Sequence, residues 1–207
     1  MDGTLINSMT YHVIAWTQAF EENGYHPGEL IFYLNEGVRH PVTVRQRLHE
    51  LGFDNPSEDL IKKIYERKRE IFENIVQINP NDGVMELLDM LKGKVKLGIV
   101  TGGVRSVTKK VVANLFDGYF DFVVDYESTE KGKPDPDPFL KGVELTGLPK
   151  SGILAVENAP TGVKSAVAAG ITCWAVSTTL EQQYLSEANR VFADFHEVKQ
   201  ALLAHLD

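Results

Sequence analysis

The sequence predicts an α/β fold: a doubly wound parallel sheet with an inserted small helical cap domain. Two observations predict it. After residue 79, short apolar runs of strand length alternate with amphipathic helical segments, which is typical of a parallel sheet covered by helices on both faces. Before that point, every periodic segment has helical spacing. We therefore expect residues 1–8 and 79–207 to form the α/β core and residues 9–78 to form the cap.

The cap is expected to contain three helices. Residues 9–23 repeat apolar side chains at helical spacing and stop at Gly24. Residues 41–51 begin with a proline and end before a glycine, the expected punctuation of a helix. A longer helical pattern opens at Pro56-Ser57 and runs to about Val76.

The core is expected to alternate helices and strands along the chain. Each predicted strand is continuously apolar, as a strand buried on both faces should be. The expected helices lie at 84–92, 104–116, 137–146 and 161–169, and the expected strands at 95–100, 121–124, 153–156 and 172–176.

Composition limits the classes of function. The 207 residues include 21 Lys and Arg against 29 Asp and Glu, so the net charge is −8, and 43% of the residues are hydrophobic. An acidic surface repels phosphate backbones and anionic lipid, which argues against nucleic acid or a membrane as partner. Cys173 is the single cysteine, and the first residues have neither the basic flank nor the apolar run of a secretion signal. We expect a soluble, cytoplasmic monomer that acts on a small molecule.

Polar residues directly follow two of the predicted strands. Thr101 ends the first strand, and Glu157-Asn158 ends the third. In a doubly wound sheet, ligands bind outside the carboxyl ends of the strands. These side chains are therefore expected at one edge, where a ligand would bind.

Four segments carry a resemblance to a known family. They are Asp2-Gly3-Thr4-Leu5, Thr101, Lys133-Pro134 and Glu157-Asn158-Ala159-Pro160-x-Gly162. In order and spacing they resemble the four motifs of the haloacid dehalogenase superfamily, specifically its phosphatases and the phosphomutases related to β-phosphoglucomutase. The resemblance covers essentially the whole chain and implies Mg²⁺-dependent phosphoryl chemistry on a small phosphorylated metabolite.

The residue types suit that chemistry independently of the resemblance. A phosphoryl group in transfer spreads negative charge over its oxygens, so it needs positive groups and hydrogen-bond donors around it. Lys133 could supply a fixed charge and Thr101 a hydroxyl donor. The N–H groups of Gly102 and Gly103, at the start of a predicted helix, could add donors where the helix dipole favours an anion. Carboxylates hold Mg²⁺, usually one or two together with waters and phosphate oxygens.

The first motif departs from the family pattern. In the family it is Asp-x-Asp-Gly-Thr/Val: the first Asp attacks phosphorus, and the second protonates the leaving group. Here Met1 takes the x position and Asp2 the second Asp, so the nucleophile position would precede Met1. We expect the native product to begin upstream, with a central strand leading into that Asp. The alternative is a non-catalytic protein of the same fold that binds phosphate or a partner.

The fourth motif departs as well. Relatives often have Glu-Asp where this chain has Glu157-Asn158, and the second acid ligates Mg²⁺ in the family. The Asn amide oxygen can still coordinate a cation. The resemblance therefore implies Asp2, Glu157 and Asn158 as metal ligands.

The predicted cap resembles the cap that closes over the active site in this family. Tyr11-His12-x-x-Ala15-Trp16 is similar to the start of the β-phosphoglucomutase cap, where the matching His helps govern the acid corresponding to Asp2. Alternatively, His12 is a packing residue of the cap. The resemblance also implies that Arg39 and Lys68 contact phosphate or hydroxyl groups of the substrate.

Hydrolysis of a small phosphorylated metabolite, for example a sugar phosphate, is the leading hypothesis for the reaction. Mutase transfer is the second hypothesis. The cap pattern fits both.

Overall fold

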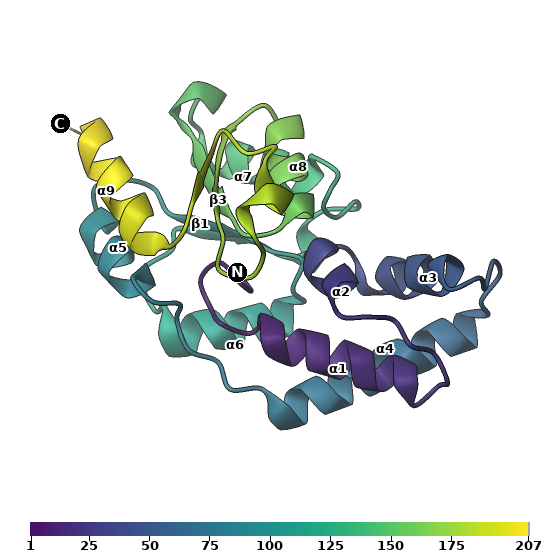
Figure 1. Cartoon of the computed structure of the whole chain (residues 1–207). Helices are drawn as coiled ribbons and strands as arrows, with labels where there is room; N and C mark the ends of the chain where they lie inside the picture. The colour runs from purple at the N-terminus through teal and green to yellow at the C-terminus, as the bar shows by residue number, and fades with distance from the viewer. Residues whose placement is uncertain (207) are drawn as a thin grey trace.

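The cap helices pack around a hydrophobic cluster of their own. The computed structural model describes residues 1–206, and Figure 1 shows the cap (purple to blue) beside the core. The helices α1 and α4 lie side by side, and the buried residues of the cluster include Trp16, Phe20 and Ile64. The cap helices are α1 (Met9–Glu21), α2 (Leu30–Leu34), α3 (His40–Glu50) and α4 (Glu58–Ile75).

Local sequence signals explain where these helices begin. The Ser57 hydroxyl caps α4 by accepting a hydrogen bond from the Leu60 N–H at 3.2 Å, and Glu58 and Asp59 occupy its first turn. Pro41 lies in the first turn of α3. Helix α2 was not predicted, because its five residues are too few to show a helical period.

The core contains parallel strands between two layers of helices. The strands are β1 (Gly98–Val100), β2 (Phe122–Val124), β3 (Leu154–Glu157), β4 (Thr172–Val176) and β5 (Arg190–Phe192). The helices are α5 (Val84–Leu91), α6 (Arg105–Leu115), α7 (Asp137–Thr146), α8 (Pro160–Ala168) and α9 (Phe195–Leu206). Every predicted element is present to within a few residues, while β5 and α9 lie beyond the last predicted strand.

Alternate residues of β4 show how both faces are covered. Trp174 and Val176 belong to the cluster that includes residues of α5, α6 and α9. Cys173 and Ala175 belong to the cluster that includes residues of α7 and α8. Helices therefore cover both faces of the strands, and the predicted doubly wound α/β class is confirmed.

The parallel strands form two sheets instead of one. Strand β1 pairs with β2, starting at Gly98 with Phe122, and β3, β4 and β5 pair in that order. Within residues 1–206, the edges of β1 and β3 away from these partners hydrogen-bond to no strand. Ile6 forms only isolated bridges, to Asp2 and to Pro80.

Among the described residues, no helix is both long enough and apolar enough to cross a bilayer.

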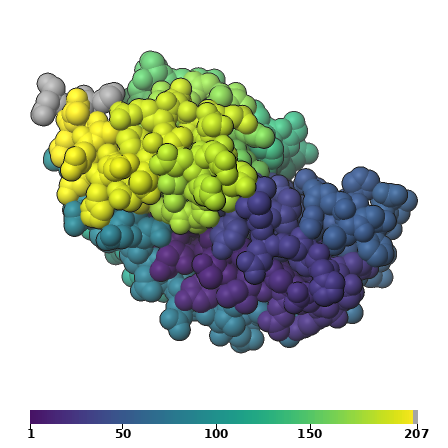
Figure 2. Space-filling model, viewed as in Figure 1, coloured from purple at the N-terminus to yellow at the C-terminus, as the bar shows by residue number. Residues whose placement is uncertain are grey.

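Figure 2 shows the cap (purple and blue) in contact with the C-terminal half of the core (green and yellow) on the face in view.

Candidate active site

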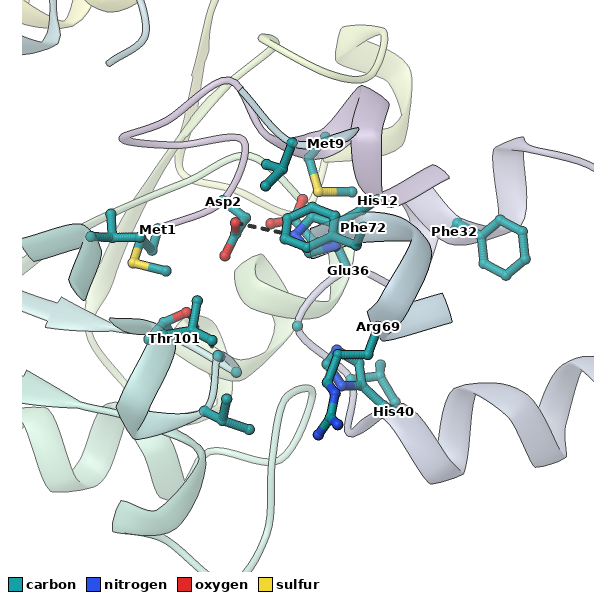
Figure 3. A pocket seen from close by; sticks show the side chains of 18 of the residues that line it. Met1, Asp2, Met9, His12, Phe32, Glu36, His40, Arg69, Phe72 and Thr101 are labelled. Atoms are coloured by element: carbon teal, nitrogen blue, oxygen red, sulfur yellow. Dashed lines mark hydrogen bonds and ion pairs between the residues drawn. The ribbon is translucent and has the colours of Figure 1, made fainter. Parts of the chain in front are cut away.

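The loops after β1 and β3 bring the predicted site residues to one cavity. Thr101 directly follows β1, Glu157 is the last residue of β3, and Asp2 lies in the N-terminal loop. All three line a cavity of about 520 Å³ between core and cap, together with Lys133 and Lys68. Figure 3 shows Asp2 and Thr101 at its core side, with His12, Glu36 and Phe72 from the cap facing them.

The turn after β1 needs small residues. Thr101 is buried, and its hydroxyl accepts a hydrogen bond from the Gly103 N–H at 3.1 Å. A Cβ on Gly102 would lie 2.8 Å from the carbonyl oxygen of Gly37, a cap residue. Glycine at position 102 therefore permits the cap backbone to sit directly on the turn.

Lys133 and Glu157 form a buried ion pair. Their side chains are 6% and 7% exposed, and the Lys133 ammonium donates to Glu157 Oε1. The ammonium also donates to the carbonyl oxygen of Val100 at 3.1 Å. Glu157 Oε2 accepts from the backbone N–H of Asn158 at 3.2 Å. The pair fixes a cation at the carboxyl end of β1, where an anion would meet it.

Asn158 links core and cap through its side-chain amide. Its Oδ1 accepts from the Thr4 hydroxyl at 2.7 Å, and its Nδ2 donates to Glu36 Oε2 at 2.6 Å and to Thr179 Oγ1 at 3.1 Å. The residue is completely buried. Its amide is therefore held in one orientation, with Oδ1 toward the N-terminal loop.

Asp2, His12 and Lys68 form a hydrogen-bonded row from core to cap. His12 Nε2 lies 3.3 Å from Asp2 Oδ1, and Lys68 Nζ lies 2.8 Å from His12 Nδ1. Because an ammonium can only donate, Lys68 donates to Nδ1, which leaves Nε2–H of a neutral His12 to donate to Asp2. The His12 ring stacks on Phe72 with centroids 4.0 Å apart. Lys68 also lies over the Trp16 ring, 5.0 Å from its centroid.

Burial and hydrogen bonding set the protonation of this row. Burial lowers the pKa of Lys68 to about 8. Burial, followed by the charge of Lys68, also lowers the pKa of His12, which favours the neutral ring. Burial alone would raise the pKa of Asp2, but hydrogen bonds from His12 and Ser8 hold it well below the usual range. Asp2 is thus ionised in the unliganded site.

The residues implied as Mg²⁺ ligands offer oxygen donors of the right kind. The hydrogen bonds to the Asp2 carboxylate all reach Oδ1, which leaves Oδ2 available. Asn158 presents an amide oxygen and Glu157 a carboxylate, although the latter is paired with Lys133. Within residues 1–206, no cluster of three or more His, Cys, Asp or Glu is arranged to hold a metal. The donor set fits an ion that keeps several waters and substrate oxygens, as Mg²⁺ does.

The structure places Arg39 against a loop of the core instead of in the cavity, where a substrate contact was expected. Its guanidinium donates to the carbonyl oxygens of Tyr126 (3.2 Å) and Thr129, and lies 4.1 Å from the Tyr126 ring centroid. It is absent from the cavity lining. Its position in the loop before α3 directs it to the core loop 126–129, so it joins cap to core.

Glu36 is a polar residue of the cavity that sequence reasoning missed. It lies in the loop between α2 and α3, and burial raises the pKa of its carboxyl group to about 8. Its backbone carbonyl oxygen accepts from the Thr161 hydroxyl. An acidic residue followed by glycine in a loop is a weak signal, and nothing in the local pattern connects it with Asn158. His40, which burial keeps neutral by lowering its pKa to about 3, was missed in the same way.

Comparisons with known proteins agree with the motif resemblance. Residues 1–176 match the family model described as haloacid dehalogenase-like hydrolase. The chain is 28% identical to a validoxylamine A 7'-phosphate phosphatase of Streptomyces hygroscopicus subsp. limoneus over 96% of this chain and 93% of the relative. It is 29% identical to hexitol phosphatase A of Escherichia coli over 96% and 90% of the two chains.

A solved structure of a candidate β-phosphoglucomutase from Bacteroides vulgatus superposes with a TM-score of 0.88. It is 29% identical in sequence, and the match covers 97% of this chain and 84% of that chain. This chain is therefore similar in sequence to proteins named as phosphatases and in structure to a protein titled as a candidate β-phosphoglucomutase.

Proposed function

Because this chain belongs to the haloacid dehalogenase-like hydrolase family, we propose that it is a Mg²⁺-dependent phosphatase of a small phosphorylated metabolite. The observation that carries the proposal is the convergence of Asp2, Thr101 and Lys133 on one cavity covered by the cap. A fixed cation, a hydroxyl donor and an acid at the carboxyl ends of parallel strands suit phosphoryl transfer.

Each residue has a defined role in this proposal. The Lys133 ammonium and the Thr101 hydroxyl bind phosphoryl oxygens, with the N–H groups of the following turn as further donors. Asp2 transfers a proton to the leaving-group oxygen. His12 holds the Asp2 carboxylate in place through the hydrogen bond to Oδ1. Bound Mg²⁺, held by Asp2, Asn158 and Glu157, would neutralise charge on the phosphoryl oxygens.

Covalent chemistry requires a carboxylate at the position before Met1, by the family pattern. A second candidate function is phosphate binding without turnover, which needs the Lys133 ammonium and the Thr101 hydroxyl but no nucleophile.

Two measurements on the native product separate these functions. Hydrolysis of p-nitrophenyl phosphate that is abolished by EDTA, and that falls by about 10²–10⁴-fold in Asp2→Asn, would support the phosphatase. Asp82→Asn is a matched control, because Asp82 is an exposed aspartate that does not line the cavity. Binding of inorganic phosphate without hydrolysis would support the second candidate. Absence of both would refute both proposals.

Mutase transfer is tested through His12. A mutase must keep Asp2 inactive toward water until a sugar phosphate closes the cap. We expect free phosphate to exceed glucose 6-phosphate when β-glucose 1-phosphate is supplied with a trace of the 1,6-bisphosphate. The opposite ratio, reversed by His12→Ala, would assign the mutase reaction.

A further inference from the structure

The backbone of the loop that carries Asp2 is held by side chains from elsewhere in the core. Gly3 and Thr4, which follow Asp2, are both buried. Among the described residues, no main-chain N–H donates to the carbonyl oxygen of Gly3 or of Thr4. Because a buried carbonyl oxygen without a donor is costly, these two oxygens depend on side-chain donors.

Asn81 donates to three consecutive carbonyl oxygens of this loop. Its side-chain Nδ2 donates to Gly3 O at 2.9 Å and to Thr4 O at 2.7 Å, and its backbone N–H donates to Leu5 O at 2.9 Å. The Thr178 hydroxyl, in the loop after β4, also donates to Gly3 O, at 2.6 Å. Within the part of the chain that the structure describes, Thr4 O therefore depends on the Asn81 amide alone.

Asn81 is itself fixed to the core. It lies at the end of the linker from α4 to α5, and its carbonyl oxygen accepts from the N–H of Val84, the first residue of α5, at 3.2 Å. Val84, Leu87 and Leu88 of this helix are buried in the hydrophobic cluster of the core. The Asn81 amide thus holds the loop from a rigid element of the core.

The Asp2 carboxylate, in contrast, is held by residues of the cap and its approach. Oδ1 accepts from the Ser8 hydroxyl at 2.5 Å and lies 3.3 Å from His12 Nε2. Ser8 directly precedes α1, and His12 lies in it. These contacts orient the carboxylate, whereas the position of the backbone that carries it depends on the donors from Asn81 and Thr178. A group that transfers a proton works only at hydrogen-bond distance, so both its backbone and its side chain have to be fixed.

We propose that Asn81 is a positioning residue for the reaction: by holding the carbonyl oxygens of Gly3 and Thr4, its amide keeps Asp2 aligned with the leaving-group oxygen. This inference rests on the proposed function, because it takes Asp2 as the group that transfers a proton to that oxygen. Asn81 does not line the cavity, so it acts through the loop and not by contact with the substrate.

The test compares the hydrolysis of two aryl phosphates by the native product in MgCl₂. Phenolate is a stronger base than p-nitrophenolate, so phenyl phosphate needs a well-placed proton donor more than p-nitrophenyl phosphate does. The measured quantity is kcat/KM, which includes the step in which the leaving group departs. Inhibition by inorganic phosphate reports the phosphoryl site separately.

The variants are Asn81→Ala, Thr178→Val and a matched control, Asn79→Ala. Asn79 is an exposed asparagine of the same linker, and within residues 1–206 its hydrogen bonds to Asn7 involve only its backbone groups. The control therefore removes an asparagine side chain without removing a hydrogen bond.

We expect kcat/KM of Asn81→Ala to fall by about 10–100-fold with phenyl phosphate and by clearly less with p-nitrophenyl phosphate. The inhibition constant of inorganic phosphate should stay close to the wild-type value, because Thr101 and Lys133 are unchanged. Thr178→Val leaves one donor on Gly3 O and should show the same pattern to a smaller extent. Asn79→Ala should behave as the wild type does.

A merely structural role of Asn81 would lower the melting temperature and the amount of active protein, and would reduce both hydrolysis rates by the same factor. Equal reductions with the two esters, or unchanged rates, would therefore refute the positioning role while the proposed function stands. If the wild type hydrolyses neither ester, the proposed function is wrong and the inference about Asn81 falls with it. If Asn81→Ala does not fold, the same comparison made on Thr178→Val decides.

Discussion

Removing the Lys133 ammonium should destabilise the protein severely, because the buried Glu157 carboxylate would lose its counter-charge. Both side chains are at least 93% buried, and beyond the ammonium Glu157 keeps only the Asn158 N–H as a described donor. Breaking a buried pair from one side typically costs about 3–5 kcal/mol. We expect Lys133→Met to lower the free energy of unfolding by about that amount.

The assay is urea denaturation of a double-mutant cycle. Glu157→Gln alone leaves the ammonium unpaired, while Lys133→Met combined with Glu157→Gln removes both charges. We expect the double variant to be destabilised by clearly less than the sum of the single changes, with a coupling of about 1–3 kcal/mol. Lys131→Met is the control: the Lys131 side chain is 66% exposed and its ammonium pairs with Asp135 at 3.3 Å, so its loss should cost less than about 1 kcal/mol. Additive single effects would refute the reasoning.

Three further predictions concern pH, metal and packing. Burial lowers the pKa of Lys68 to about 8, so the unfolded chain binds this proton more strongly than the folded protein does. The free energy of unfolding, measured by urea denaturation, should therefore rise between pH 8 and 10.5. The Lys68→Met variant should lack that rise. In the absence of metal, Asn158→Asp should lower the melting temperature, since a carboxylate cannot donate the two hydrogen bonds that the amide donates. Addition of MgCl₂ should then raise the melting temperature of this variant by more than it raises that of the wild type. Gly162→Ala should cost about 1–3 kcal/mol, because its Cβ would lie 2.3 Å from Glu157 Cδ.

Each of these three has an internal control. For the pH series, Lys63→Met removes an exposed lysine of the same helix and should retain the rise. In the metal series, if MgCl₂ shifts the melting temperature equally in the wild type and in Asn158→Asp, residue 158 is not a ligand of the ion. Gly152→Ala meets no atom within 4 Å and should leave stability nearly unchanged; an equal cost at 152 and 162 would contradict the packing argument.

The sequence by itself determined the order and type of most elements. Apolar spacing and terminal signals such as Ser57 located α4 to within a residue or two, because periodicity and capping are local properties. The apolar runs also placed Thr101 and Glu157 at the ends of strands, and parallel strands bring their carboxyl ends to one edge. The start of β1 was placed too early, at 95 instead of 98, because apolar residues before a strand look like the strand itself.

Only the tertiary structure decided how cap and core meet. Glu36 and Arg39 lie three residues apart in one loop, yet they contact different parts of the core. Arg39 donates hydrogen bonds to carbonyl oxygens of the core loop 126–129. Glu36 accepts a hydrogen bond from Asn158, which lies 122 residues further along the chain. No local pattern encodes which of two neighbouring polar side chains enters a cavity. That outcome depends on how the whole cap is oriented on the core, where burial, shape and hydrogen-bond satisfaction are settled together by residues far apart in sequence.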